Sequence, residues 1–304
     1  RSSPPRPPPS RTSRSVPEAR EAGERITYLI ASFNRGRFVA ACLESVRRQT
    51  NDQWLAIVVD DASTDESLSA IRPFVDERIR LVVHPRNLGY IVTLKRLIAE
   101  ASTDIVAILD ADDAITPDAT ERLLTAYATH PSSEFVYSRY AVYDATLSHA
   151  AGDYGSAIPD GRTAMVDGVV GAIRSFRRSA YARTPGLDDT MLYAEDRVLV
   201  YKLEEVTRPA FVDAVLYHYR DLPDSQSHDP RKRAIGARNT WRARRAAFRR
   251  RRISGIMRAS FELHALADYV AFRWPRPAMV SFLARHIAGA ARVLCRRYRL
   301  RLPS

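Results

Sequence analysis

Three aspartates gather at the end of one apolar run. Residues 105–109 are all apolar, and Asp110, Asp112 and Asp113 follow them directly. Like charges this close repel and raise each other's pKa unless a cation joins them. Divalent cations with oxygen ligands take carboxylates and keep positions open for substrate phosphates. The pattern indicates a divalent metal site, although Asp113 would also suit the positive end of a following helix.

Polar side chains also follow two other apolar runs. Asn34 comes shortly after the run 26–32, and Asp60 and Asp61 close the run 54–60. Each pattern fits an ordinary strand-to-helix turn, in which Asn and Asp satisfy backbone N–H groups. Each also fits a nucleotide pocket, in which a carboxylate accepts a hydrogen bond from a base. The residues alone leave both interpretations open.

The apolar runs are typical of buried parallel strands, because they are short, rich in β-branched residues and mostly unbroken. They span 26–32, 54–60, 79–83 and 104–110, and helical patterns follow at 37–49, 65–75, 89–101 and 117–128. This alternation predicts a Rossmann-like α/β fold, with a mostly parallel sheet flanked by crossover helices. Ligands bind beyond the carboxyl ends of such strands, so the polar groups should converge there.

Two of these helices carry signals for their first residues. Ser63 and Glu66 have the spacing of a capping box, which predicts that Ser63 caps the second helix. Thr116 precedes Pro117 and Asp118, which predicts an N-cap at Thr116 and a proline at the first helical position.

The regular alternation ends at about residue 133. We expect strands in 134–144 and 209–221, a loop-rich segment at 145–170, a helix within 193–206 and mainly helix from about 232 onward. Residues 1–25 are rich in Pro, Ser and Arg, which predicts a disordered lead-in.

Charge is distributed unevenly along the chain. The net charge of +12 combines +3 for residues 1–25, −9 for residues 26–229 and +18 for residues 230–304. The basic segment fits a helix packed on the rest of the protein, an interfacial helix on anionic lipid, or a nucleic-acid-binding tail. An apolar stripe from Met279 to Tyr298 fits either a helix packed on the protein or an interfacial helix on lipid. Nucleic acid is not expected, because the larger segment is acidic and has no aromatic stacking platform.

Cysteine usage and hydropathy bear on location. Cys42 and Cys295 form no disulfide framework and no metal-binding spacing. The sequence has no apolar run of about 18 residues that would span a membrane, and its beginning has no apolar signal core. These features predict a cytoplasmic protein, with peripheral attachment to the cytoplasmic face of the inner membrane as an option through residues 230–304.

The motifs together resemble the family 2 glycosyltransferases, which have the GT-A fold. The matching segments are 32–34, 45–50, 58–65, 87–89 and 109–113 and, more loosely, 176–181, 185–189, 193–196 and 217–227. The resemblance implies a catalytic domain over 26–229, with a nucleotide-binding half at 26–113 and an acceptor half at 114–229. Residues 230–304 form a basic helical C-terminal extension in this interpretation.

The resemblance implies roles on the donor side. Asp61 corresponds to the aspartate that reads the pyrimidine base, and Ala31 and Asn34 correspond to the nucleotide pocket. Residues 110–112 correspond to the DXD motif, so Asp110 and Ala111 would contact the donor and Asp112 would be the main ligand of Mn²⁺ or Mg²⁺.

On the acceptor side, Asp196 corresponds to the catalytic base; without the resemblance, Asp196 would fit a first-turn acid of the next helix.

Two further positions concern the donor phosphates and the metal. Arg220 would contact the donor phosphates. Family members often carry a histidine where this chain has Leu222, which puts a third metal ligand in doubt. His218 is a nearby substitute, although it would also fit a histidine satisfied in the core.

The activity implied is metal-dependent inverting transfer of a sugar from a nucleotide diphosphate, with UDP expected, to a hydroxyl acceptor. The acceptor would be a glycan or lipid-linked molecule of polysaccharide or cell-surface glycan synthesis. Two alternatives are a GT-A protein that kept the fold and lost activity, and a nucleic-acid-binding protein that uses its basic tail.

Overall fold

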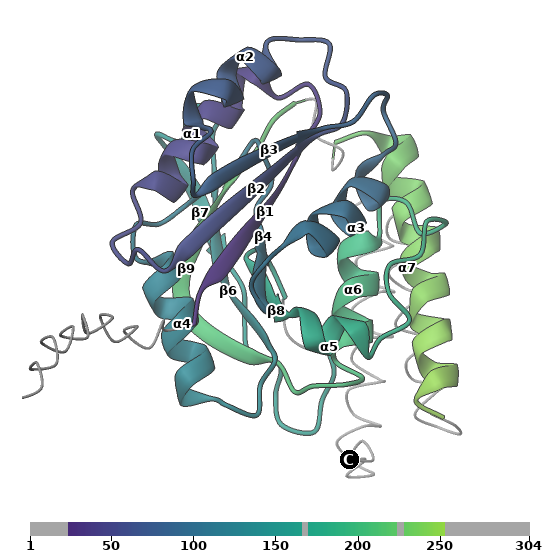
Figure 1. Ribbon diagram of the computed structural model, residues 1–304. Coiled ribbons are helices and arrows are strands. Elements are labelled where there is room, and N and C mark those ends of the chain that lie inside the picture. Colours follow the sequence, from purple (N-terminus) through teal and green to yellow (C-terminus); the bar gives the residue numbers. More distant parts are fainter. Residues whose placement is uncertain (1–23, 166–169, 224–227, 253–304) are drawn as a thin grey trace, which may run out of the picture.

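The computed structural model describes residues 24–165, 170–223 and 228–252. These residues form one mixed nine-stranded sheet with helices on both faces (Figure 1). The predicted lead-in and the apolar stripe from Met279 to Tyr298 lie outside the described residues.

The first half of the sheet is parallel, as the sequence predicts. Its strand order is β3-β2-β1-β4, and β1 lies between β2 and β4. The strands are β1 (Ile26–Ser32), β2 (Trp54–Asp60), β3 (Ile79–Val83) and β4 (Ile105–Ile108). The helices that follow them are α1 (Gly36–Arg47), α2 (Ser67–Ile71) with the 3-10 turn η1 (Arg72–Phe74), α3 (Tyr90–Glu100) and α4 (Ala119–Thr129).

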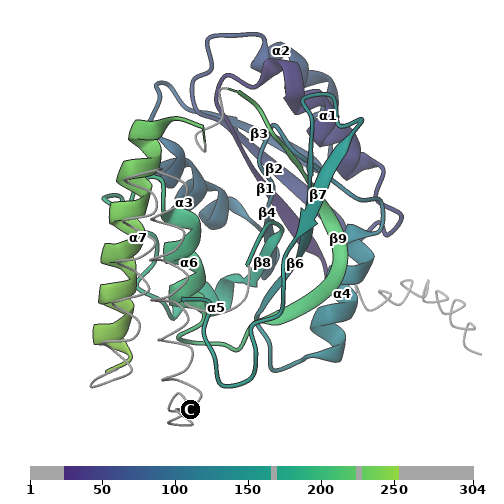
Figure 2. The same ribbon diagram turned by 180° about the vertical axis from the view of Figure 1, so that it is seen from behind.

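The second half continues the sheet in mixed orientation, in the order β4-β8-β6-β9-β5, with β7 paired to β6. Strand β8 is antiparallel to β4 and β6, so a late segment of the chain lies beside the acidic motif (Figure 2). The strands are β5 (Ala114–Ile115), β6 (Phe135–Tyr143), β7 (Ala150–Tyr154), β8 (Arg174–Arg177) and β9 (Ala210–Arg220). The helices are α5 (Arg178–Ala182), α6 (Glu195–Leu203) and α7 (Pro230–Arg250).

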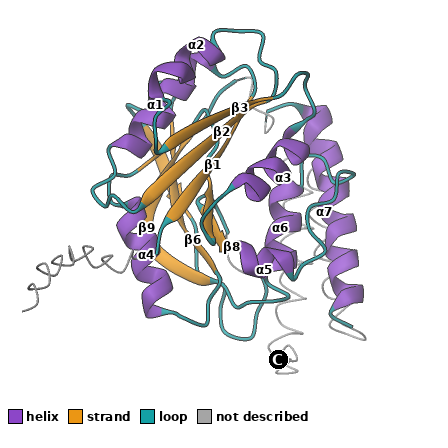
Figure 3. Ribbon diagram, in the orientation of Figure 1, coloured by secondary structure: helices purple, strands orange, loops and turns teal. Residues whose placement is uncertain are grey.

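Two apolar clusters lie on opposite faces of the sheet. One contains residues of α1 and α4, and the other contains residues of α3, α6 and α7 (Figure 3). Ala243, Ala247 and Phe248 of α7 belong to the second cluster. The first helix of the basic segment is therefore packed on the sheet-bearing part of the protein. Arg231, Arg238 and Arg249 of this helix are exposed, whereas Arg244 is buried.

Both predicted helix caps are wrong. Glu66 and Asp118 occupy the N-cap positions of α2 and α4, and neither makes a side-chain cap hydrogen bond. Ser63 instead donates its hydroxyl to Asp60 Oδ2 at 2.7 Å. Thr116 donates its hydroxyl to Asp118 Oδ1, also at 2.7 Å. Both hydroxyls stabilise the turn before the helix, and a carboxylate two or three residues away competes for them.

No helix in the described part of the chain is both long enough and apolar enough to cross a bilayer.

Candidate active site

The acidic loop between β4 and β5 is organised by one tyrosine hydroxyl. Tyr217 of β9 accepts the backbone N–H of Asp110 at 3.2 Å and donates to Asp113 Oδ2 at 2.6 Å. Its oxygen also lies 3.3 Å from Asp110 Oδ2. Burial and the charges of Asp110 and Asp113 raise the pKa of Tyr217 well above its ordinary value, so the hydroxyl stays protonated and able to donate. The loop is thereby tied to β9, about a hundred residues later in the chain.

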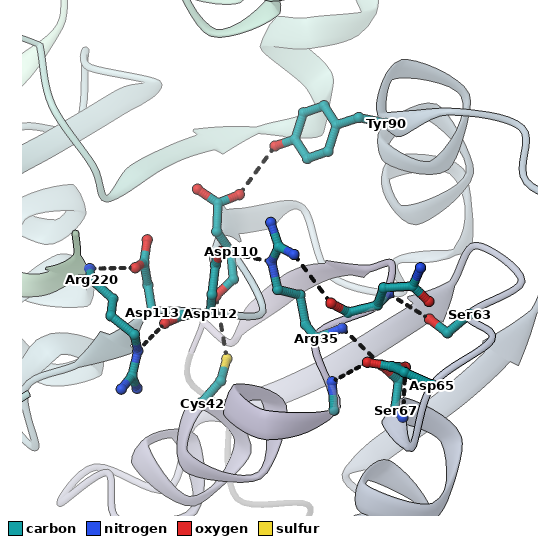
Figure 4. Close-up of polar contacts among 12 residues, drawn as sticks. Arg35, Cys42, Ser63, Asp65, Ser67, Tyr90, Asp110, Asp112, Asp113 and Arg220 are labelled. Carbon is teal, nitrogen blue, oxygen red and sulfur yellow. Dashed lines mark hydrogen bonds and ion pairs between the residues drawn. The ribbon is translucent and has the colours of Figure 1, made fainter. Parts of the chain in front are cut away.

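Asp113 is a supporting residue of this loop. It is 1% exposed, and its Oδ1 accepts the backbone N–H of Arg220 at 2.7 Å. Burial together with Asp112 and Asp110 raises its pKa well above the ordinary range. Asp113 therefore does not face the following helix; it holds the end of β9 against the loop (Figure 4).

Asp110 and Asp112 point to different partners. Asp110 Oδ1 lies 3.4 Å from the hydroxyl of Tyr90, which opens α3. Burial raises the pKa of Asp110, and Asp112 raises it further, while Arg174 opposes the shift. Asp112 Oδ2 accepts a hydrogen bond from Arg35 Nε at 2.8 Å (Figure 4). The structure thus brings the two predicted metal ligands to one loop and places a guanidinium against one of them.

The loops after β1 and β2 are bonded to each other. The backbone N–H of Asn34 donates to Ser63 Oγ at 2.9 Å, and Asn34 Oδ1 accepts the N–H of Thr64 at 2.9 Å. Asn34 and Ala62 both have positive φ angles, 52° and 61°. Such left-handed residues are uncommon outside glycine and concentrate at functional sites. Ala31, one residue before the end of β1, is partly buried and packs against the apolar cluster that contains α3.

Asp61 uses its carboxylate to hold the loop after β3. Its Oδ1 lies 2.8 Å from His84 Nδ1 and accepts the N–H of Leu88, and its Oδ2 accepts the N–H of Gly89, each at 2.8 Å. The residue is 3% exposed. Gly89 has φ +88°, which lets its N–H turn toward Asp61 just before α3 begins. Base recognition by Asp61 stays a prediction.

A second cluster joins the acidic motif to the start of α6. Arg174 Nη1 of β8 lies 3.5 Å from Asp196 Oδ2. Glu195 and Asp196 form the first turn of α6, where carboxylates face the positive end of the helix dipole. The hydroxyl of Tyr90 lies in the electric field of Asp110, Arg174 and both α6 acids, and burial with these charges raises its pKa well above its ordinary value.

The two carboxyl groups of α6 have different environments. Asp196 is 47% exposed, and its Oδ1 accepts the N–H of Arg197 at 2.7 Å. Burial raises the pKa of Glu195 to about 7, and its Oε2 is buried without a hydrogen-bond partner in the described part of the chain. Asp196 is therefore the carboxylate of this pair that is accessible to solvent, and Glu195 is directed inward.

The start of α6 is held in place by α7. Tyr193, which precedes it, has a φ angle of 62°, and the ammonium of Lys232 lies 5.9 Å from its ring centre. A Cβ at Gly236 would lie 2.5 Å from the carbonyl oxygen of Tyr193. Asn239 donates its side-chain N–H to the carbonyl of Leu192 at 2.9 Å. Three turns of α7 thus define where the segment before Asp196 runs.

His218 and Arg220 of β9, which the sequence predicts as site residues, both contact residues near the acidic loop. His218 pairs with Ala114 in the sheet, its ring lies 4.6 Å from that of Tyr143, and burial lowers its pKa. Among the residues that the structure describes, no group of three His, Cys, Asp or Glu side chains is close enough to hold a metal ion. The structure therefore does not join His218 to Asp110 and Asp112 in one ligand set.

Arg220 is 5% exposed, its Nε donates to the carbonyl of Asp112 at 2.6 Å, and its guanidinium stacks 4.9 Å from the centre of the Phe38 ring. These contacts make it part of the frame behind the acidic loop. Contact of Arg220 with phosphates stays a prediction.

Sequence reasoning missed several residues of this site: Arg35, Tyr90, Arg174, Glu195 and Tyr217. Arg35 and Tyr90 each adjoin a recognised motif, so their positions carried a usable signal. Arg174 carried none, because one arginine in an arginine-rich chain is not distinctive and its strand position follows from sheet order.

Comparison with known proteins bears on the family and the fold of this chain. The model of the family described as "Glycosyl transferase family 2" matches residues 27–184. The chain belongs to this family. The match includes β1 to β8 and the acidic loop, whereas Asp196, β9 and α7 lie beyond its last residue.

Relatives and solved structures support the same fold. Protein EpsH of Bacillus subtilis is 27% identical over 210 residues, 64% of this chain and 60% of EpsH. Glycosyltransferase GlyG of Streptococcus pneumoniae is 30% identical over 124 residues, 40% of each chain. The chain therefore matches less than two thirds of the length of either relative.

Among solved structures, S. aureus TarS in complex with UDP-GlcNAc has a TM-score of 0.57 at 15% identity, covering 90% of this chain and 91% of that one. The mannosyltransferase PcManGT from Pyrobaculum calidifontis, in complex with GDP-Man and Mn²⁺, has 0.57 at 20% identity, covering 91% and 82%. These structures support the GT-A fold for this member of the family.

Proposed function

We propose that this glycosyltransferase moves a sugar from a nucleotide diphosphate, UDP in particular, to a hydroxyl acceptor in one displacement that inverts the anomeric carbon. The observation that carries the proposal is the proximity of two acidic groups on separate elements. Asp110 and Asp112 follow β4, Asp196 opens α6, and Arg174 lies between Asp110 and Asp196 in electrostatic contact with both.

The acidic loop suits a divalent cation. Carboxylate oxygens are the ligands that Mg²⁺ and Mn²⁺ take, and burial of Asp110 beside Asp112 leaves negative charge that a cation would stabilise. The guanidinium at Asp112 shows that this carboxylate already attracts positive charge. Asp112, with Asp110, would hold the metal. A bound Mn²⁺ or Mg²⁺ supplies charge that stabilises the leaving diphosphate.

The chain's own residues would do the rest of the work. Asn34, Asp61 and Ala31 line the loops after β1 and β2, where the nucleoside would bind. Asp196 would accept the proton of the acceptor hydroxyl as its oxygen bonds to the sugar, a contribution of typically 10²–10⁴-fold. Tyr90 and Tyr217 keep Asp110 oriented toward the sugar and diphosphate.

The charges on the outer side of α7 support a proposal about the acceptor and the location. Arg250 and Arg251 are paired with Glu205 and Glu204, so the densest arginine run is partly neutralised. Arg231 and Arg238 are exposed on the turns of α7 that hold the segment before Asp196. We infer a cytoplasmic enzyme held at an anionic membrane surface, which would present a lipid-linked or cell-surface glycan acceptor.

A ligand screen tests the reaction. Thermal unfolding is measured with UDP-GlcNAc, UDP-glucose, UDP-galactose and GDP-mannose, each with and without Mn²⁺. A ligand that binds the folded state at 100 times its Kd should stabilise it by about 2.7 kcal/mol. We expect a rise in Tm for UDP-sugars only with Mn²⁺, and release of UDP over time. A protein that is not stabilised by any of these pairs would contradict the proposal, and binding without turnover would favour an inactive GT-A protein.

Vesicle sedimentation tests the location. The protein should sediment with vesicles of phosphatidylglycerol and phosphatidylcholine at low salt, and much less with phosphatidylcholine alone. Arg231→Gln with Arg238→Gln should weaken this binding, whereas Arg250→Gln, which removes a partner of Glu205, should change it little. Equal sedimentation with both kinds of vesicle would leave α7 with a packing role only.

A further inference from the structure

Arg174 is a charged side chain on an interior strand of the sheet. The register of β8 pairs it with Ile108 of β4 on one side and with Tyr137 of β6 on the other. Its side chain is 12% exposed. A guanidinium in this position loses most of its hydration, which only nearby negative charge or hydrogen bonds can replace. The position of Arg174 therefore requires acidic partners.

Two carboxylates from different elements supply that charge. Arg174 Nη1 is 3.5 Å from Asp196 Oδ2 on α6. Burial lowers the pKa of Arg174, but the charges of Asp196 and Asp110 outweigh burial and raise it above its ordinary value. The guanidinium thus interacts at once with the acidic loop after β4 and with the first turn of α6.

Among the residues that the structure describes, the Asp196 carboxylate makes one other hydrogen bond. Its Oδ1 accepts the N–H of Arg197, a contact within the same turn of α6. That contact does not relate the carboxylate to the sheet. The contact with Arg174 does, because β8 is hydrogen-bonded to β4, and β4 leads directly into Asp110.

We propose that Arg174 is a positioning residue that fixes the direction of the Asp196 carboxylate relative to the donor diphosphate. The inference rests on the proposed function, in which Asp196 is the base. In that step the acceptor O–H gives its proton to Asp196, its oxygen bonds to the anomeric carbon, and the bond to the diphosphate breaks with its electron pair. Displacement of the base by about 1 Å can slow such a step on the order of 100-fold.

A direct role of Arg174 in binding the donor would give a different result. Arg174 Nε is buried without a hydrogen-bond partner in the described part of the chain. If Nε held a donor phosphate, loss of the guanidinium would weaken nucleotide binding. A positioning role predicts slower turnover with nucleotide binding retained.

The experiment compares Arg174→Gln and Arg174→Lys with Arg177→Gln. Arg177 is a matched control, because it lies on the same strand and pairs with Asp104 at the far end of β4. Binding of UDP with Mn²⁺ is measured by calorimetry, and release of UDP from UDP-GlcNAc with Mn²⁺ gives kcat and KM.

For Arg174→Gln we expect kcat to fall about 100-fold with KM and the Kd of UDP within about threefold. The lysine should restore part of the rate, and Arg177→Gln should match the wild type. A tenfold rise in Kd or KM at unchanged kcat would assign Arg174 to donor binding instead. Wild-type turnover in Arg174→Gln would also overturn the proposal.

A thermal double-mutant cycle separates this proposal from the proposed function. Arg174→Gln is made in the wild type and in Asp196→Asn, and the fall in Tm is compared. The fall should be smaller in the Asp196→Asn protein, since the ion pair is already lost. Equal falls overturn the link between the two residues whatever the turnover, whereas a wild type that releases no UDP from any UDP-sugar overturns the proposed function.

Discussion

Arg35 and Asp112 form an ion pair across the site, with the Nε atom of one 2.8 Å from the Oδ2 atom of the other. Arg35 belongs to the loop after β1 and Asp112 to the loop after β4, so the pair connects two neighbouring strand ends. The guanidinium occupies the carboxylate that the DXD motif assigns to the metal. A metal that binds Asp112 therefore competes with Arg35.

Removal of the Arg35 guanidinium should increase the affinity of the acidic loop for a divalent cation. For Arg35→Ala we expect Mn²⁺, in the absence of nucleotide, to bind about fivefold more tightly, roughly 1 kcal/mol, as measured by calorimetry. Arg47→Ala, at the other end of α1 and paired with Asp76, should leave Mn²⁺ affinity unchanged. Weaker Mn²⁺ binding in Arg35→Ala would show that the arginine supports the metal site.

The base can be separated from donor binding by Asp196→Asn. We expect turnover to fall by about 10²–10⁴-fold, because an amide cannot take the acceptor proton, while UDP affinity with Mn²⁺ stays within about threefold. Asp189→Asn is the control, since Asp189 lies on the preceding loop, is 61% exposed and pairs with Lys95. Turnover is measured as UDP release; normal turnover in Asp196→Asn would remove Asp196 from the mechanism.

The hydroxyl of Tyr217 should affect both stability and binding. Tyr217→Phe leaves Asp113 buried without its 2.6 Å donor, so we expect a loss of about 1–3 kcal/mol in the free energy of urea unfolding. The loosened acidic loop should also weaken binding of UDP with Mn²⁺ severalfold. Tyr127→Phe removes an equally buried hydroxyl, bonded to Ser175, and should cost stability alone. A binding loss in both variants would contradict a specific role for Tyr217.

Glu195 should make stability depend on pH near neutrality. Burial raises its pKa from 4.5 to about 7, so the folded protein binds more protons than the unfolded chain between these values. The contribution of Glu195 to stability is complete below pH 4.5 and is lost as pH rises through 7, a change of about 3 kcal/mol. The free energy of urea unfolding of Glu195→Gln should therefore differ less between pH 5 and pH 8 than that of the wild type. An unchanged pH dependence would show that Glu195 is ionised at no cost in the folded protein.

The sequence predicted the parallel half of the sheet and the convergence of its polar ends. This succeeded because the four strands are continuous apolar runs and because parallel strands place their carboxyl ends on one edge. Asn34, Asp61 and Asp110 were found in that way, and the family resemblance added Asp196. The type of each element depends on local pattern, which a sequence displays directly.

The site residues and the strand order that the sequence did not predict depend on contacts between distant segments. Tyr217 meets Asp110 across 107 positions, and Arg174 meets Asp196 only because β8 lies between β4 and β6. The mixed order of the second half of the sheet has no local signature. The capping predictions failed for a related reason, since nearby carboxylates took the hydroxyls of Ser63 and Thr116.

Helix α7 lies close to the backbone just before Asp196 at Gly236, which is far from Asp196 in the sequence. A single added methyl group there would collide with the Tyr193 carbonyl and shift the turn that leads into Asp196. The family model matches residues 27–184, so this contact lies outside the matched segment. A substitution at Gly236 would therefore move the turn before Asp196 from a helix that makes no part of the acidic loop after β4.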